Sequence, residues 1–203
     1  MKILIIDNSA VVKRDNTYCT NNLNGSFLSD LISCKNYLTY FQFAFETENS
    51  ISNFDLKANG VNYKPLKLYK NKVIRYLYAY LTAIPYILKN DFIYIYYPSS
   101  FRYIAFLCKL FNKKYGLYIR GEEGVTNSLS RKIYQYAYTI FTVSDYFTAF
   151  VNEFTGKNLA YTIRPMIPFT EKDVVFNRSY KENGKFRVLF LGRIAKDKGI
   201  QEL

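Results

Sequence analysis

The stretch DFIYIYY, residues 91–97, decides the fold class. After one acidic residue it is an unbroken apolar and aromatic run, and Pro98 ends it because proline cannot continue a paired strand. A run this short and this continuous is typical of a strand that is buried on both faces of a sheet. Such strands occur in parallel sheets covered by helices, so the stretch predicts helical segments before and after it.

The same alternation of strand and helix runs through the first 165 residues. Apolar runs bounded by turn residues predict strands, and apolar residues at helical spacing predict helices. The predicted strands cover 2–7, 39–45, 60–66, 91–97, 114–120, 138–144 and 158–164, and the predicted helices 26–38, 73–88, 100–111, 129–137 and 145–154. A loop is predicted up to about residue 24, and Ser26 is the predicted cap of the first helix. Ser144 is the predicted cap of the last helix, which is expected to end near Gly156. We therefore predict an α/β fold for residues 1–165, with a Rossmann-like, doubly wound parallel sheet.

The loops after the strands are the expected ligand sites, because ligands of such sheets lie outside the carboxyl ends of the strands. Here those loops follow Asp7, Tyr97, Arg120 and Ser144. No G-x-G-x-x-G follows the first strand and no G-x-x-x-x-G-K-[ST] occurs, which argues against a dinucleotide oxidoreductase and a P-loop enzyme. The chain has no histidine, so proton transfer falls to carboxylates, and neither a Ser-His pair nor a His-ligated metal can form.

The composition is that of a folded domain, with 49% hydrophobic and 22% charged residues. Asp7 interrupts the first apolar run before a signal peptide could form, and the longest apolar stretch, 73–88, is too short to span a bilayer. The three cysteines have neither metal-ligand nor disulfide spacing, which suits a reducing compartment. These features predict a cytoplasmic location.

Basic residues are concentrated in one third of the chain. Residues 56–121 contain twelve Lys and Arg and a single acid, Asp91, in a chain whose net charge is +12. This asymmetry predicts an anionic partner: nucleic acid, a phosphorylated small molecule or an acidic membrane. A group of cations precedes a helical run rich in Leu, Ile and Tyr, a pattern that resembles an interfacial amphipathic helix. They are Lys67, Lys70, Lys72 and Arg75. A core helix with a solvated lysine end fits the same periodicity.

The last part of the chain breaks the alternation. Residues 166–185 combine prolines, charges and an Asn-Gly pair without periodicity, which predicts an interdomain linker. Residues 186–203, FRVLFLGRIAKDKGIQEL, then set out a buried-type strand, a Gly192-Arg193 turn and a Lys198-Gly199 pair. We interpret 186–203 as the start of a second domain that is truncated as its first helix begins.

The Gly-Arg, Lys-Gly and Leu pattern of residues 192–203 resembles the signature of family-4 retaining glycosyltransferases with the two-Rossmann GT-B architecture. DFIYIYYPSS, YGLYIRGEEG and YTIFTVSDYFTAFV are similar to the acceptor-side strand ends of that family. The resemblance implies the N-terminal half of a GT-B fold, a nucleotide-sugar donor, a lipid-linked or saccharide acceptor, and no cofactor or metal. It also implies that the donor diphosphate is held by Gly192, Arg193 and Lys198, which charge-assisted bonds and a helix N-terminus would favour. It names no catalytic residue.

Two segments are candidate acceptor or phosphate sites. The first is the helix start at Asn24, Gly25 and Ser26, where backbone comes close to a phosphate or acceptor in the resembled family. The second is the strand-end loop of Arg120, Gly121, Glu122 and Glu123, in which a glutamate would orient a sugar hydroxyl. A plain capped helix and a solvated acidic loop fit the same residues equally well.

These implications lead to one functional expectation and one alternative. We expect a retaining, hexosyltransferase-type glycosyltransferase of surface polysaccharide or glycan synthesis, peripheral at the inner face of the membrane. Because most of the donor domain is missing, this chain alone is expected to transfer no sugar. The alternative is a non-enzymatic basic module that binds acidic membrane lipid or a phosphorylated ligand. We expect no nucleic-acid partner, since the chain carries no recognised nucleic-acid motif.

Overall fold

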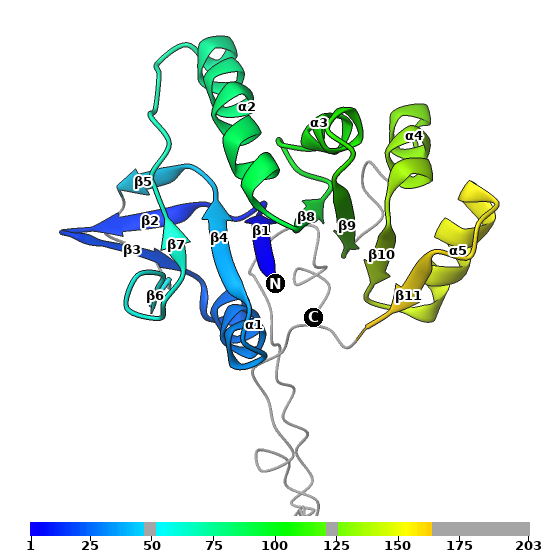
Figure 1. Ribbon diagram of the computed structural model, residues 1–203, viewed down its shortest axis with the longest axis horizontal. Helices are drawn as coiled ribbons and strands as arrows, with labels where there is room; N and C mark the ends of the chain where they lie inside the picture. Colours follow the sequence, from blue (N-terminus) through cyan, green and yellow to red (C-terminus); the bar gives the residue numbers. More distant parts are fainter. Residues whose placement is uncertain (47–51, 121–125, 164–203) are drawn as a thin grey trace, which may run out of the picture. The chain divides into compact units, whose positions relative to one another are not determined.

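The computed structural model describes residues 1–46, 52–120 and 126–163, which build a seven-stranded sheet with helices on both faces (Figure 1). The strand order is β11-β10-β9-β8-β1-β4-β7, and every neighbouring pair is parallel. The strands are β1 (Lys2–Ile6), β4 (Tyr37–Phe41), β7 (Asn62–Tyr63), β8 (Phe92–Tyr97), β9 (Lys114–Ile119), β10 (Thr139–Thr142) and β11 (Ala160–Thr162). The order reverses at β1, which confirms the predicted Rossmann-like sheet.

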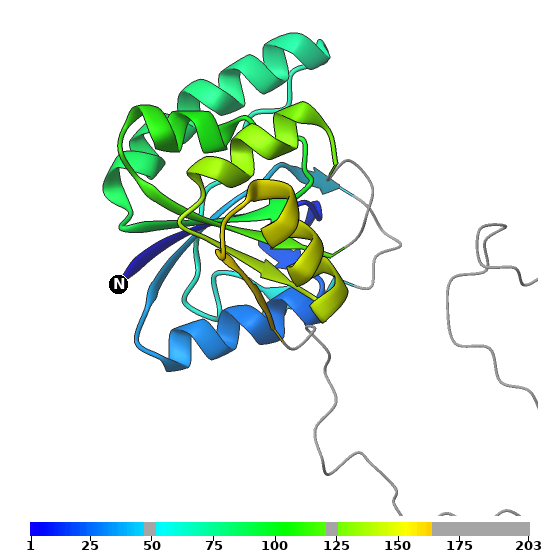
Figure 2. The ribbon, with the colours of Figure 1, turned by 90° about the vertical axis from the view of Figure 1, so that its right-hand side faces the viewer.

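Helices cover the sheet from both sides. They are α1 (Asn22–Ser33), α2 (Lys72–Lys89), α3 (Ile104–Leu110), α4 (Ser128–Tyr136) and α5 (Asp145–Thr155). Figure 2 shows α1 on one face and α2, α3 and α4 on the other. The side chains agree, because Leu28 of α1 packs with Ile3 and Ile5, whereas the buried residues of the other helices pack with Leu4 and Ile6. The fold is therefore doubly wound, as predicted.

The strand that decided the fold class lies near the centre of the sheet. β8 pairs with β1 on one side and with β9 on the other. Ile93 and Ile95 belong to the core under α2 to α5, while Tyr94 and Tyr96 belong to the core on the α1 face. Both faces are buried, which is why the stretch is continuously apolar instead of alternating.

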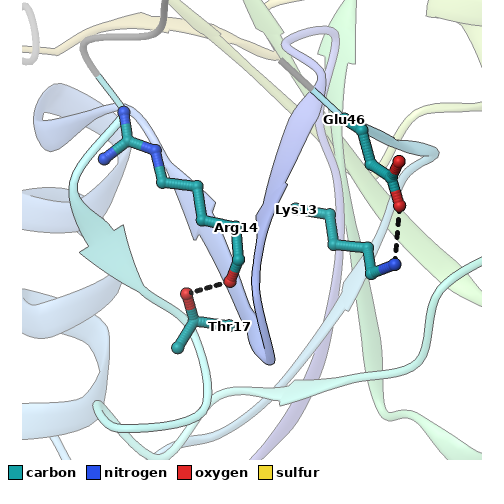
Figure 3. A network of polar contacts seen from close by, with 4 residues as sticks. All are labelled: Lys13, Arg14, Thr17 and Glu46. Carbon is teal, nitrogen blue, oxygen red and sulfur yellow. Dashed lines mark hydrogen bonds and ion pairs between the residues drawn. The ribbon is translucent and has the colours of Figure 1, made fainter. Parts of the chain in front are cut away.

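The predicted loop between β1 and α1 is wrong in part, because it contains a hairpin. β2 (Val11–Arg14) and β3 (Thr17–Thr20) pair antiparallel and belong to a second, four-stranded sheet with β5 (Ala44–Glu46) and β6 (Phe54–Asp55). Lys13 donates to Glu46 at 2.6 Å and ties β2 to β5, while the Thr17 hydroxyl donates to the Arg14 carbonyl across the turn (Figure 3). The strands are short and partly polar, so their apolar pattern is too weak to predict them.

The helix ends test two capping predictions. Ser144 caps α5 by accepting from the Phe147 amide, and Gly156 ends that helix in the left-handed region with φ 68°, as glycine prefers. Ser26 does not cap α1: the cap is Asn21, whose side chain accepts from the Asn24 amide, and Ser26 lies inside the helix. The helix therefore starts one turn earlier than predicted. The predicted linker 166–185 and the strand and turn of 186–203 lie outside the described residues.

An apolar groove of about 620 Å³ runs along the α1 face of the sheet. Ile3, Phe92, Tyr94 and Phe141 line it from the strands, and Phe27 lines it from α1. It reaches the amino ends of the strands, near Lys114 and Tyr138. The groove is thus directed toward the edge of the sheet opposite to the expected ligand loops.

Two substitutions distinguish whether Asn21 or Ser26 caps α1. Asn21→Ala removes the acceptor for an orphan helix N–H and is expected to lower the free energy of unfolding by about 1 kcal/mol. Ser26→Ala, at an exposed position within the helix, is expected to leave it unchanged or slightly higher. Urea unfolding followed by circular dichroism measures both; the reverse order would restore Ser26 as the cap.

Gly25 is expected to be required for packing. It is buried in α1, and a methyl group there would overlap the Phe54 ring and come within 2.6 Å of the Phe54 Cβ. Gly25→Ala gains helix propensity but should still lower the free energy of unfolding by about 1 to 2 kcal/mol, because overpacking outweighs that gain. Phe54→Ala removes the ring that the added methyl group would overlap. Gly25→Ala is therefore expected to lower the free energy of unfolding less in the Phe54→Ala background than in the parent chain. A Gly25→Ala variant more stable than the parent would contradict the packing argument.

Candidate functional site

The carboxyl ends of the strands meet around the switch point between β1 and β8. There the chain leaves β1 through Asp7, Asn8 and Ser9, and leaves β9 through Arg120. Because neighbouring parallel strands end at the same edge, these two exits lie close enough for Arg120 to donate to the Asn8 side chain at 3.2 Å. This edge is where an open α/β sheet binds its ligands.

Asp7 is a buried carboxylate with several hydrogen-bond donors. Its Oδ1 accepts from the backbone N–H groups of Asn8 at 2.6 Å and Ser9 at 3.0 Å. Its Oδ2 accepts from the Asn24 side-chain amide and from the Tyr40 hydroxyl. The first pair fixes the turn after β1, and the second ties that turn to α1 and β4. The carboxylate therefore joins three elements that are distant in sequence.

Burial and hydrogen bonding act on this carboxylate in opposite directions. Burial raises the pKa of Asp7, while the hydrogen bonds from Tyr40, Ser9 and Asn8 and the charge of Arg120 lower it without cancelling the effect of burial. Burial and the nearby Asp7 charge raise the pKa of Tyr40 well above its usual value. Tyr40 consequently stays protonated and able to donate, and it also contacts the Thr20 hydroxyl at 3.2 Å.

Arg120 supplies a positive charge at this edge, beside Asn8. Its guanidinium lies 5.4 Å from the centroid of the Tyr96 ring and 5.8 Å from that of Tyr118. The side chain is exposed, and among the described residues its guanidinium uses one of its five N–H donors, toward Asn8. A guanidinium held by two rings and one amide oxygen is pre-organised to bind an anion such as a phosphate or carboxylate.

The three predicted residues of the α1 start have different surroundings. Asn24 is buried and bonded to Asp7, Gly25 is buried against Phe54, and Ser26 is exposed. Asn24 thus joins the cluster of Asp7, Asn8 and Arg120 by contact, whereas Gly25 has a packing reason of its own. All three residues lie within α1, whose first residue is Asn22, so the predicted site at a helix start falls inside the helix and not at its cap.

The other predicted site residues are distributed as follows. Gly121, Glu122 and Glu123, and likewise Gly192, Arg193 and Lys198, lie outside the described residues. Lys67, Lys70, Lys72 and Arg75 lie in and before the first turn of α2. Within residues 1–46, 52–120 and 126–163, no three His, Cys, Asp or Glu side chains are grouped in a way that could hold a metal ion.

Sequence reasoning pointed to the loop after Asp7 but missed the roles of Asp7, Asn8 and Tyr40. One signal was present, since Asp7 is an acid directly after an apolar strand that is buried on both faces. The remaining contacts could not be read from sequence, because Tyr40 and Arg120 are 33 and 112 residues away from their partners. Only strand order brings them together.

Comparisons with known proteins support the fold. No protein-family model matches the chain, and no curated protein matches it in sequence. The structure is similar to the crystal structure of Acinetobacter baumannii MurG, with a TM-score of 0.50 and 10% sequence identity over 85% of this chain and 47% of that one. The chain therefore spans about half the length of that protein. Its α/β, Rossmann-like fold resembles half of the GT-B fold of MurG.

Proposed function

We propose that this chain is the acceptor-side half of a GT-B glycosyltransferase that transfers a sugar from a nucleotide-sugar to a lipid-linked or saccharide acceptor. The observation that carries the proposal is the similarity to one half of MurG, together with a pre-organised cation at the carboxyl edge of the sheet. The finer assignment, a retaining hexosyltransferase of family-4 type acting in surface polysaccharide or glycan synthesis, rests on the resemblance of residues 186–203.

The proposed chemistry divides between two groups of cations. Arg120 would bind an anionic group of the acceptor at the carboxyl edge of the sheet. Gly192, Arg193 and Lys198 would hold the donor diphosphate and stabilise the charge that develops on the leaving phosphate. In this division residues 1–165 form the acceptor side, 166–185 the linker and 186–203 the start of the donor side. No resident cofactor is part of the proposal.

Sugar transfer tests this assignment. In a polypeptide in which a donor-binding half follows residue 203, Arg193→Ala and Lys198→Ala are each expected to lower kcat about a hundredfold or more, because they remove charge stabilisation of the leaving group. Transfer of radiolabelled sugar from nucleotide-sugars into lipid extract is the measurement, with Lys157→Ala as the control. Residues 1–203 assayed as such should bind acceptor without turnover. Turnover by residues 1–203 alone would contradict the division into acceptor and donor sides.

A second observation concerns the outer face of α2. Ile74, Leu77, Leu81 and Leu88 recur at helical spacing and are 48–59% exposed, while Ala79, Ala83 and Ile87 on the opposite face are buried in the core. We call the four exposed residues the α2 ridge. An apolar stripe of this kind on a helix that also packs on a core is typical of an interaction surface. Within the described residues no helix has both the length and the apolar character needed to span a bilayer.

Several cations lie at the N-terminus of α2, where the helix dipole disfavours positive charge. Lys72 and Arg75 lie in the first turn, where the positive end of the dipole disfavours cations, and no acid accompanies them. Lys67 and Lys70 precede the helix and are exposed. Two of these cations have a contact within the chain, because Arg75 donates to the Tyr69 carbonyl at 2.8 Å and Lys67 lies 4.9 Å from the centroid of the Tyr69 ring. Helix stability does not favour Lys72, and an external anionic surface would explain why Lys70 and Lys72 are placed here. This observation supports a peripheral position of the protein on an acidic membrane; the inner face is part of the proposal and follows from the expected cytoplasmic location.

Vesicle binding tests the membrane surface. Lys70→Ala/Lys72→Ala is expected to weaken binding to phosphatidylglycerol-containing vesicles about thirtyfold, from about 1 kcal/mol for each lysine near an anionic surface. Leu77→Asp should weaken it by removing apolar contact, and high salt should act mainly through the lysines. Co-sedimentation is the measurement, and Lys35→Ala/Lys57→Ala is the matched control for lost charge.

The same assay separates the enzyme from the alternative, a non-enzymatic basic module for acidic lipid or a phosphorylated ligand. Vesicle binding by a polypeptide that has a donor-binding half but transfers no sugar would favour the module. Equal binding to neutral and anionic vesicles would contradict the role of the α2 cations. Salt-sensitive binding to RNA or DNA, with none to vesicles, would replace the membrane with nucleic acid as the partner.

A further inference from the structure

The carboxylate of Asp7 is connected to the candidate anion site through the turn that it organises. Its Oδ1 holds the N–H groups of Asn8 and Ser9, so the backbone of the turn cannot move without breaking two hydrogen bonds. The carbonyl oxygen of Asp7 also accepts from the Gln42 side chain at 2.6 Å, which ties the turn to the residue that follows β4. The Asn8 side chain is carried on this turn, and its Oδ1 is the oxygen to which Arg120 donates.

Arg120 is thereby held by two kinds of contact. Its guanidinium lies 5.4 Å from the centroid of the Tyr96 ring and 5.8 Å from that of Tyr118, and the Asn8 oxygen receives one of its N–H groups. Without the Asn8 oxygen, an exposed arginine at the end of a strand keeps many rotamers, and binding an anion then costs the entropy of fixing it. A positioned guanidinium loses less entropy when it binds.

We propose that Asp7 and Asn8 are positioning residues that hold the Arg120 guanidinium ready for an anionic group of the acceptor, a phosphate or diphosphate. Arg120 alone would touch the anion, and Asp7 acts through Asn8. This proposal rests on the proposed function for the identity of the ligand, but not for the positioning itself. It adds to the acceptor site two residues that sequence reasoning had not included.

The structure also indicates which property of Asp7 matters. Asp7→Asn keeps a side-chain oxygen for the Asn8 and Ser9 amides and introduces an NH₂ group in place of Oδ2. Within residues 1–46, 52–120 and 126–163 the buried Oδ1 of Asn24 has no hydrogen-bond partner, so it can accept from that NH₂ group after the Asn24 amide rotates. Asp7→Asn is therefore expected to keep the turn, whereas Asp7→Ala removes the oxygen that holds it.

The test measures the position of Arg120 first, without any ligand. The Arg120 Nε–H signal in an NMR spectrum of the whole chain reports its place beside the two tyrosine rings. Asn8→Ala and Asp7→Ala should move this signal toward that of a solvated arginine, while Asp7→Asn should leave it near its original position. Asp55→Asn is the matched control, because Asp55 also accepts a backbone N–H, from Ala58 at 3.0 Å. If Asp7→Ala does not fold, Asn8→Ala still tests the link, since Asn8 has no part in the buried Oδ2 contacts.

Anion binding is then measured with inorganic pyrophosphate by isothermal titration calorimetry. Arg120→Ala should weaken binding about tenfold or more, the usual effect of losing a hydrogen bond between charged groups. Asn8→Ala should weaken pyrophosphate binding severalfold. The double variant Asn8→Ala/Arg120→Ala should bind pyrophosphate as well as Arg120→Ala does, because Asn8 acts only through Arg120.

Each outcome decides a separate point. Additive losses in the double variant, or an Arg120 signal that Asn8→Ala leaves unchanged, would overturn the positioning proposal. An Asp7→Asn variant that folds but displaces Arg120 as Asp7→Ala does would also overturn it, because charge and not the oxygen would then be responsible. Absence of pyrophosphate binding by the parent chain would contradict the anion role in the proposed function, and the NMR comparison would still decide the positioning.

Discussion

The position of β1 between β4 and β8 is the constraint on which the rest of the structure depends. β1 forms parallel ladders with both neighbours, and Leu4, Ile5 and Ile6 are fully buried. No polar side chain can be placed on such a strand without losing its hydration, so polar groups first appear where the strand ends. Asp7 occupies that place. The reversal of strand order at β1 separates the connections on its two sides and opens the edge above it to ligands.

The aromatic residues of the α1 face connect this edge to the core. Tyr40, Tyr96 and Tyr118 come from three strands and belong to the same core cluster. The Tyr40 hydroxyl donates to Asp7, and the Tyr96 and Tyr118 rings lie near the Arg120 guanidinium. The same side chains therefore fill the interior and present polar or π surfaces to Asp7 and Arg120. This dual use gives a physical reason for tyrosine, in place of phenylalanine or leucine, at Tyr40, whose hydroxyl donates to Asp7. Core packing and site geometry are then properties of one set of residues.

Local patterns predicted the parts of the fold whose signals are local. The strands β1, β8, β9 and β10, the helix α5 with its Ser144 cap, and the doubly wound class follow from apolar runs, spacing and turn residues. The hairpin of β2 and β3 was missed, because strands of four residues with Lys and Arg carry little periodicity. The cap of α1 was assigned to Ser26 because serine is a common cap, whereas the tertiary contact of Asn24 with Asp7 favours a helix that starts at Asn22.

The sequence by itself determined the class of the fold and the concentration of positive charge before and within α2, and it predicted the edge of the sheet at which a ligand would lie. Each of these depends on composition or on residues close together in the chain. Tertiary structure alone decided which side chains meet at that edge, because the partners of Asp7 and Asn8 come from α1, β4 and the end of β9. It also decided that the apolar residues of the α2 ridge face outward. Periodicity shows that a helix has two faces, but only packing against the sheet determines which of them is buried.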